Sequence, residues 1–230
     1  MSPLLIPLAI ILILVGVLFL RTMWKWEEQQ LKKFKDFAEQ MGMEFSAKGD
    51  RALRESLAAF DLFSKGDAAP PIPSLTNVLH GDSEQLGYSE DFEVRILEYM
   101  VASGQHADHQ TVICFQSPQL NLPKFQLGPE GWGHKIGSKL GYQDIDFESH
   151  LTAVGFSKKY LLRGKDEQKI RALFTDEVLA FFAGQDKLCV EGFSSHLCFY
   201  REEKLIEPEY IPAFMKEGFE VFRVFARKQN

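Results

Sequence analysis

The first twenty residues of this 230-residue chain lack any charged side chain. An α-helix rises about 1.5 Å per residue, so such a run is about as long as the ~30 Å hydrocarbon core of a bilayer is thick. A buried helix of a globular domain is rarely apolar on every face over this length. The missing charge therefore predicts a transmembrane anchor over residues 1–22. Its apolar residues are Leu4, Leu5, Ile6, Ile10, Ile11, Leu12, Ile13, Leu14, Val15, Val17, Leu18, Phe19 and Leu20.

Two further absences argue against a cleaved signal peptide. Ser2 and Pro3 stand where a signal peptide carries basic residues, and no small-x-small cleavage site follows the apolar run. Pro3 and Pro7 fall in the first two turns of the expected helix, where proline is tolerated. We therefore expect the apolar run to persist as an anchor.

Basic residues are also missing on the N-terminal side of the run. Five follow it within about one helix length: Arg21, Lys25, Lys32, Lys33 and Lys35. The positive-inside rule predicts an inner (plasma) membrane protein with its N-terminus outside and residues 21–230 in the cytoplasm. The residues expected in the headgroup zone are Arg21, Trp24, Lys25 and Trp26.

Cysteine is scarce, with three residues and no C-x-x-C spacing. This odd number argues against a disulfide framework and favours reduced thiols at Cys114, Cys189 and Cys198, as in a cytoplasm. We expect Cys189 and Cys198 to face each other across a hairpin. Packing explains buried thiols between apolar neighbours better than a redox or zinc role.

Motifs of the common enzyme classes are absent. The sequence contains no nucleophile elbow, dinucleotide fingerprint, kinase signature or H-E-x-x-H pair. The segment 133–139 resembles a phosphate loop only superficially, because it lacks the G-K-[ST] order. A net charge of −6 argues against nucleic acid as the main partner. We therefore expect no cofactor and no nucleic acid, and lean away from an enzyme.

What the sequence does contain is a folded domain with twenty phenylalanines. Residues 23–42 form an expected juxtamembrane amphipathic helix with Leu31, Phe34, Phe37, Ala38 and Met41 on one face. Residues 43–230 form an expected α+β domain, with an antiparallel β-meander and packed helices. Alternation predicts strands at 77–80, 93–102, 111–117, 124–127, 160–163, 188–191 and 196–201. Periodicity and caps predict helices at 50–59, 132–140, 166–174, 175–183 and 212–227.

One polar stretch is a candidate site. If residues 144–150 are extended, Asp144, Asp146, Glu148 and His150 project from one face while the apolar residues project from the other. Carboxylates and an imidazole in this arrangement fit a divalent cation or acid–base chemistry. The alternative is a solvated edge paired with Lys158 and Arg163, since no metal motif has this spacing alone. Residues 103–109, with His106 and His109, are interpreted as a hairpin turn.

Several short motifs together resemble a family of bacterial single-span membrane proteins with no assigned function. They are Asn77–Gly81, Leu122–Phe125 with Pro129 and Glu130, Gln143–Phe147, Tyr160–Gly164, Arg171 with Phe174, and Val190–Gly192. They span about residues 75–200. The resemblance implies a cytoplasmic domain on an N-terminal anchor and supplies no catalytic residues.

The sequence therefore favours a non-enzymatic interaction module tethered to the inner membrane, with an unknown protein partner besides the lipid bilayer. Two alternatives stay open. One is a metal-dependent enzyme or binder using Asp144, Asp146, Glu148 and His150. The other is a β-barrel-like lipid-binding module of the pleckstrin type, a fold analogy that does not by itself establish function.

Overall fold

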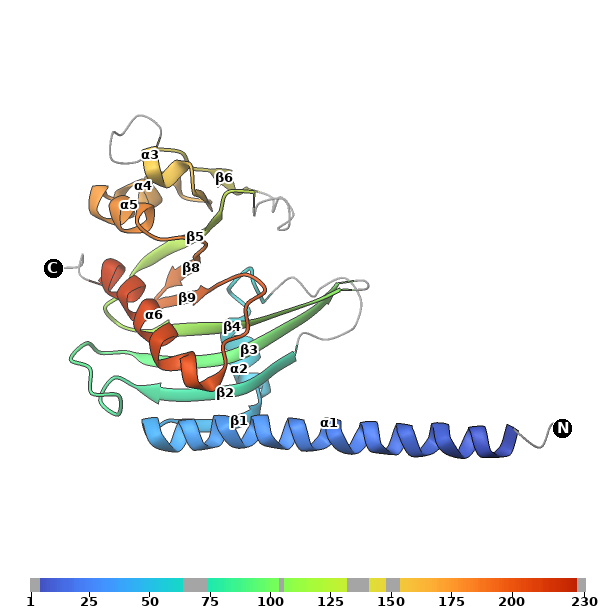
Figure 1. Cartoon of the computed structure of the whole chain (residues 1–230). Helices are drawn as coiled ribbons and strands as arrows, with labels where there is room; N and C mark the ends of the chain where they lie inside the picture. The colour runs from blue at the N-terminus through green and yellow to red at the C-terminus, as the bar shows by residue number, and fades with distance from the viewer. Residues whose placement is uncertain (1–4, 64–73, 104–105, 132–140, 148–153, 227–230) are drawn as a thin grey trace.

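An antiparallel sheet of nine strands forms the centre of the protein in the computed structural model (Figure 1). The structure describes residues 5–63, 74–103, 106–131, 141–147 and 154–226. The strand order is β1-β2-β3-β4-β9-β8-β5-β7-β6. The strands are β1 (Glu44–Lys48), β2 (Ser74–Asp82), β3 (Glu93–Ser103), β4 (His106–Gln116), β5 (Leu122–Pro129), β6 (Gln143–Asp144), β7 (Tyr160–Gly164), β8 (Cys189–Ser194) and β9 (His196–Tyr200). The helices are α1 (Leu5–Met41), α2 (Arg51–Leu57), α3 (Val154–Ser157), α4 (Glu167–Leu173), α5 (Asp176–Ala183), the 3-10 helix η3 (Pro208–Tyr210) and α6 (Ile211–Ala226).

This architecture confirms the predicted α+β class. The chain forms the meander β1-β2-β3-β4, and the later hairpin β8–β9 then adds to β4. The strand order runs from an edge at β1 to an edge at β6, so the paired strands form an open sheet rather than the barrel supposed by the pleckstrin-type alternative.

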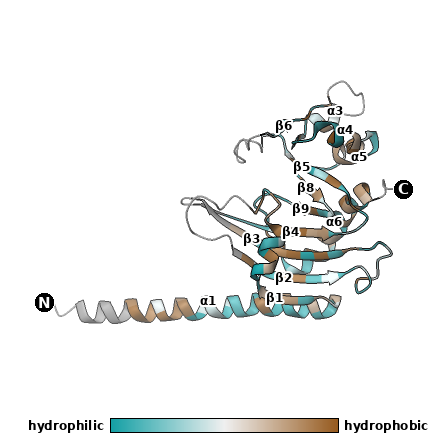
Figure 2. Cartoon of the chain, turned by 180° about the vertical axis from the view of Figure 1, so that it is seen from behind, coloured by the Kyte–Doolittle hydropathy of each residue, from teal (hydrophilic) through white to brown (hydrophobic). Residues whose placement is uncertain are grey.

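Helix α1 is continuous from Leu5 to Met41. Of the predicted apolar face, Phe34, Phe37 and Ala38 are buried against the domain, while Leu31 and Met41 are half-buried. Gly42 follows the helix with a φ of +67°. The N-terminal half of α1 projects beyond the domain, and its described part is largely apolar (Figure 2). In the described part of the chain, none of the helices is both long enough and apolar enough to cross a bilayer.

The two faces of the sheet carry different cores because side chains alternate along each strand. On the α6 face, Ile113, Phe115 and Phe199 pack in one cluster with Phe222 of α6. Gly218 of α6 permits this close approach, since a Cβ there would lie 3.0 Å from Phe199 Cδ1. The opposite face, here called the α2 face, carries a smaller cluster under α2. Its members include Leu53, Leu57, Tyr99, Val112, Cys114, Cys198 and Tyr200.

Most predicted elements are confirmed, and several differ. β1, the two-residue β6, the short helix α3 and the 3-10 helix η3 were not predicted. The β3–β4 turn is shorter than residues 103–109, because β4 already begins at His106, paired with Ser103. β8 continues to Ser194, so the late turn is also tighter than expected. The helix predicted at 132–140 lies outside the described residues.

Candidate functional site

The predicted polar stretch at 144–150 is described only in its first half. Arg163 Nε donates to Asp144 Oδ1 at 2.6 Å, and Ser157 Oγ donates to Asp146 Oδ1 at 2.8 Å. Ile145 is buried, so the predicted alternation is confirmed there. Glu148 and His150 lie outside the described residues. Within the described ranges, no group of three or more His, Cys, Asp or Glu side chains could hold a metal ion.

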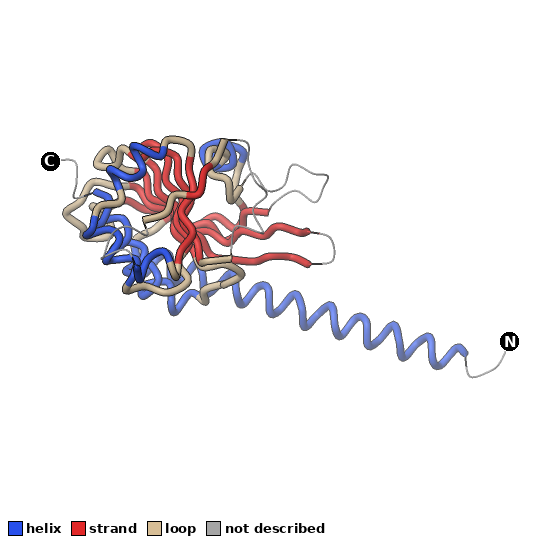
Figure 3. Tube along the Cα trace, turned by 90° about the horizontal axis from the view of Figure 1, so that it is seen from above, coloured by secondary structure: helices blue, strands red, loops and turns tan. Residues whose placement is uncertain are grey.

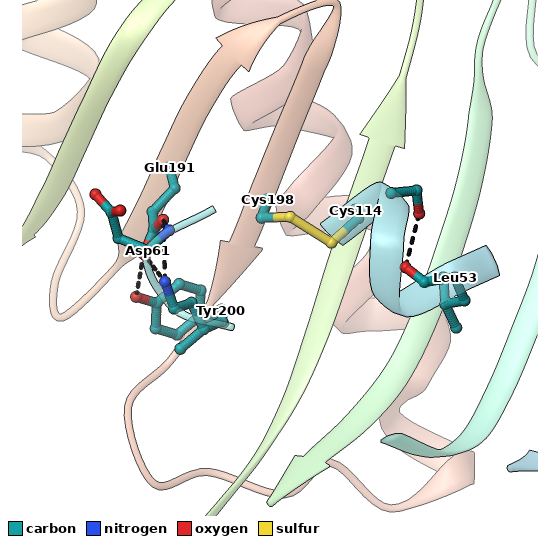
Figure 4. Close-up of a disulfide and its surroundings, with 8 residues drawn as sticks. Leu53, Asp61, Cys114, Glu191, Cys198 and Tyr200 are labelled. Carbon is teal, nitrogen blue, oxygen red and sulfur yellow. Dashed lines mark hydrogen bonds between the residues drawn. A yellow bond between two sulfur atoms is a disulfide. The ribbon is translucent and has the colours of Figure 1, made fainter. Parts of the chain in front are cut away.

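The predicted cysteine arrangement is wrong. Cys114 of β4 and Cys198 of β9 lie directly opposite each other, with Cα atoms 4.2 Å apart, and form a disulfide (Figure 4). Cys189 lies outside this bond and pairs in register with Tyr200 rather than Cys198. The tight turn after Ser194 explains the difference, because it shifts the β8–β9 register by two residues from that of a four-residue turn.

Two buried carboxylates, Asp61 and Glu191, lie together on the α2 face (Figure 4). Their side chains come from segments 130 residues apart in the chain, yet Asp61 N–H donates to Glu191 Oε2 at 2.7 Å. Burying a carboxylate is unfavourable unless hydrogen bonds or counter-charges replace its water. Their partners therefore decide what this pair can do.

Glu191 of β8 receives hydrogen bonds from the chain segment that follows α2. Besides Asp61 N–H, the N–H of Leu62 donates to Glu191 Oε1 at 3.1 Å, and Tyr200 Oη donates to the same oxygen at 3.3 Å. Tyr99 Oη in turn donates to the Leu62 carbonyl oxygen at 3.0 Å. Glu191 thus satisfies two backbone donors of a buried turn, which would otherwise cost about 1–3 kcal/mol each.

Asp61 is held by three side chains from the other end of the sheet. Gln126 Nε2 donates to Asp61 Oδ2 at 2.9 Å, and Tyr142 Oη donates to the same oxygen at 2.6 Å. Lys124 Nζ lies 3.3 Å from Asp61 Oδ1, and this lysine side chain is 31% exposed. The segment after α2 is therefore fastened to β5, to β8 and to the residue preceding β6.

The phenols of this network are held as neutral donors. Burial raises the pKa of Tyr142, and the hydrogen bond to Asp61 raises it further. Burial likewise raises the pKa of Tyr200, with Glu191 adding to the effect, and the pKa of Tyr99 for the same two reasons. Each carboxylate is occupied by internal partners, so the arrangement favours a structural fastening over acid–base chemistry.

An open groove lies elsewhere, between α6 and the connection that follows β9. It has a volume of about 470 Å³, and Ile206 and Phe214 form its buried floor. Leu205 and Tyr210 on its rim are 47% and 61% exposed. This groove was not predicted from the sequence, where residues 202–210 combine four glutamates with Leu205, Ile206 and Tyr210.

A second groove, of about 450 Å³, lies between α2 and strands β1 to β3. His80 lines it and stands between two carboxylates, with Nδ1 3.7 Å from Glu44 Oε2 and Nε2 3.6 Å from Glu93 Oε2. Arg95, also in the lining, donates from Nη2 to Glu93 Oε2 at 3.3 Å. Charges of both signs thus meet here.

Comparison with known proteins adds one finding. No family model and no curated protein matches the chain. Among solved structures, the chain is similar to the mycobacterial trehalose monomycolate transport factor A, TtfA, with 12% sequence identity and a TM-score of 0.56. The match covers 86% of this chain and 93% of TtfA. The two proteins share a fold. At this identity the likeness shows nothing more, and the resemblance to an uncharacterised single-span family stays a prediction.

Proposed function

We propose that this chain is a non-enzymatic interaction module tethered to the inner membrane by its N-terminal helix. The observation that carries the proposal is the continuity of α1. One helix joins the uncharged N-terminal run to Phe34 and Phe37, which are buried in the domain. The described apolar residues of α1 between Leu12 and Trp26 are 43–70% exposed. Water is an unfavourable environment for so much contiguous apolar surface, and a bilayer would cover it.

The non-enzymatic part of the proposal has two supports. The buried carboxylates Asp61 and Glu191 are engaged by internal donors, and Asp144 and Asp146 are paired with Arg163 and Ser157. The structural neighbour TtfA is named as a transport factor, and this is compatible with a protein that works by binding.

We further propose that the domain lies on the cytoplasmic side. Five basic residues follow the apolar run within about one helix length. The disulfide between Cys114 and Cys198 argues against the cytoplasm, because such bonds persist mainly in oxidising compartments. In a reducing cytoplasm this pair would be held as two thiols, directly opposed across β4 and β9.

A fusion experiment on the full chain tests the side of the membrane. A dual reporter at Asn230, with one enzyme active only in the cytoplasm and one only outside it, should give the cytoplasmic signal. A control chain carrying Arg21→Glu together with the same reversal at Lys25, Lys32, Lys33 and Lys35 should lose orientation bias, because the positive flank is gone. An external signal from the native chain would contradict the cytoplasmic placement and favour the disulfide as its resting state.

A further inference from the structure

The two bonded cysteines stand in the middle of a row of polar side chains that crosses the α2 face of the sheet. Residues directly opposite each other on neighbouring strands project to the same face. The strand register places one residue of each strand in this row, in the order Glu44, His80, Arg95, Cys114, Cys198, Glu191, Gln126, Arg163 and Asp144. Seen from above, the strands lie between α2 and α6, so the row is on the side away from α6 (Figure 3).

The backbone holds the two cysteines opposite each other. Their Cα atoms are 4.2 Å apart, the close spacing of the antiparallel pairs in which side chains approach most nearly. The neighbouring pairs Ile113–Phe199 and Phe115–Leu197 continue the same register on both sides. Because the ladder between β4 and β9 sets this spacing, the sulfur–sulfur bond can form and break without a rearrangement of the strands.

The charged neighbours of the two cysteines differ in sign. Arg95 lies opposite Cys114 on β3, whereas the buried carboxylate of Glu191 lies opposite Cys198 on β8. A cation beside a thiol favours the thiolate, which is the reactive form, and a carboxylate disfavours it. Glu93, the ion-pair partner of Arg95, lies opposite Gln116 rather than Cys114.

The titratable neighbours of Cys198 along β9 add no positive charge near pH 7. Burial lowers the pKa of His196, and the positive charge of Arg95 lowers it further, so this imidazole is neutral. Burial raises the pKa of Tyr200, so its phenol is neutral too. The charges around the pair therefore favour Cys114 as the thiolate.

Access from solvent favours the same cysteine. The groove of about 450 Å³ between α2 and strands β1 to β3 is lined by Arg95 and by Leu53 of α2. Leu53 packs in one cluster with both cysteines, and α2 lies beside Cys114 (Figure 4). Cys114 is 7% exposed and Cys198 is 0% exposed. A small polar reagent that enters the groove therefore meets the Cys114 side of the pair first.

We propose that Cys114 and Cys198 form a reversible, peroxide-oxidised pair, in which Cys114 reacts with the peroxide and Cys198 closes the bond. The Cys114 thiolate attacks one oxygen of hydrogen peroxide, the O–O bond breaks, and the leaving hydroxide takes up the thiol proton as water. Cys198 sulfur then attacks the sulfur of the resulting sulfenic acid, and the hydroxyl group leaves with the Cys198 proton as a second water. Two thiols lose two electrons, and one peroxide is reduced to two waters.

The bond formed in this way joins the two halves of the sheet. β4 ends the meander that contacts α1, and β9 belongs to the half formed by β5 to β9, so the cysteines are 84 residues apart in the chain. A dithiol opens the bond by thiol–disulfide exchange and is itself oxidised to a disulfide. This oxidation site goes beyond the function proposed above and does not depend on the side of the membrane, because only the resting state of the pair differs.

The first test uses the purified full chain in detergent micelles, without substitutions. After reduction with dithiothreitol and desalting, limiting iodoacetamide should label Cys114 at least about fivefold faster than Cys198, because the thiolate is the reactive form. Mass spectrometry of the cysteine peptides measures both rates. One equivalent of hydrogen peroxide should then close the Cys114–Cys198 bond, and dithiothreitol should reopen it. Equal labelling, faster labelling of Cys198, a bond to Cys189 or no bond would overturn the proposal.

Single-thiol variants separate the two roles, both in a Cys189→Ala background. Cys198→Ser should stop the reaction at the sulfenic acid of Cys114, which dimedone traps. Cys114→Ser should give at least about fivefold less dimedone adduct, because Cys198 lies beside a carboxylate and away from the groove. Equal adduct in the two variants would overturn the proposal.

The role of Arg95 has a matched control in the same groove. Arg95→Gln should slow the reaction of Cys114 with peroxide by about fivefold, because the cation that favours the thiolate is gone. Lys48→Gln removes the same charge from the groove lining, but Lys48 lies on β1, so the rate should stay within about twofold. Equal losses would overturn the proposal, since the rate would then follow net charge and not the neighbour of Cys114.

Discussion

Asp61 joins segments that lie far apart in the chain. It is buried, and its carboxylate forms an ion pair with Lys124 and accepts hydrogen bonds from Gln126 and Tyr142. Breaking a buried, hydrogen-bonded charge network by removing one member leaves the others without partners. Its importance is therefore to the fold, in holding the α2 segment on the sheet.

The Asp61→Ala substitution should lower the free energy of unfolding by about 3–5 kcal/mol, because Lys124 and two hydrogen-bond donors lose their acceptor. The control is Asp144→Ala, which removes a carboxylate whose side chain is 63% exposed and should cost at most about 1 kcal/mol. Urea unfolding of the full chain in micelles measures both. Similar losses in the two variants would mean that the network does not act as a fastening.

Tyr160 gives a prediction about alkaline pH. Burial raises its pKa to about 12, above the ordinary value of 10. The unfolded chain then loses this proton first as pH rises, so stability present below pH 10 is lost between pH 10 and about 12. The loss amounts to about 1.4 kcal/mol per pH unit.

Tyr160→Phe should therefore reduce the slope of the free energy of unfolding against pH by about 1.4 kcal/mol per pH unit between pH 10 and about 12. At pH 8 the variant should cost only about 1 kcal/mol, the value of one hydrogen bond, here from Leu188 N–H to Tyr160 Oη. Denaturant unfolding between pH 8 and 12 provides the comparison. An unchanged alkaline slope would show that the phenol does not stay protonated on folding.

At the scale of elements, α1 is both a stalk and a part of the core. Its last turns bury Phe34 and Phe37, and the Phe34 ring stacks on that of Phe45 in β1 at 6.3 Å. β1 is an edge strand, and α1 packs against it. Covering an exposed edge in this way protects it from pairing with other chains.

Truncation of Phe34 tests this packing. Phe34→Ala should lower the free energy of unfolding by about 3–5 kcal/mol, since it removes a buried aromatic ring and leaves a cavity. Lys35→Ala, on the exposed side of the same turn, should change it by less than about 0.5 kcal/mol. Thermal unfolding of the full chain reports both. A small effect at Phe34 would mean that α1 is only loosely attached to the domain.

The elements that were predictable are those whose signals are local. Asp50 and Asp166 cap α2 and α4 by accepting from the N–H groups of Leu53 and Lys169, and each is the first residue of a helix predicted from the sequence. β1 was not predicted because it is a short edge strand with little alternation beyond Phe45. The Asp61–Glu191 contact spans 130 residues, and no local pattern encodes such a pairing.

The cysteine pairing failed for a related reason. The hairpin was expected to turn over four residues, but Ser194 adopts a φ of +54° and allows a tighter turn. In addition, β9 has β4 as its other neighbour, and this supplies Cys114 as the partner of Cys198. A single sequence shows neither the register nor the second neighbour of a strand.

At the scale of the whole molecule, the Cys114–Cys198 disulfide favours an oxidising compartment, whereas the basic residues after the apolar run favour the cytoplasm. If the domain is cytoplasmic, rapid acid quenching of cells followed by thiol labelling of the denatured chain should modify all three cysteines. Oxidant treatment should lower this to one, with Cys189 left labelled. Labelling of a single cysteine in untreated cells would contradict the cytoplasmic placement.

The central claim is that residues 1–22 hold the chain in a membrane, and alkaline carbonate extraction of the full chain tests it most directly. The native chain should remain in the membrane pellet. Leu12→Asp with Leu14→Asp should shift it to the supernatant, because each carboxylate near the centre of a span disfavours insertion by about 2.5–3.5 kcal/mol. Release of the native chain by carbonate would contradict the account.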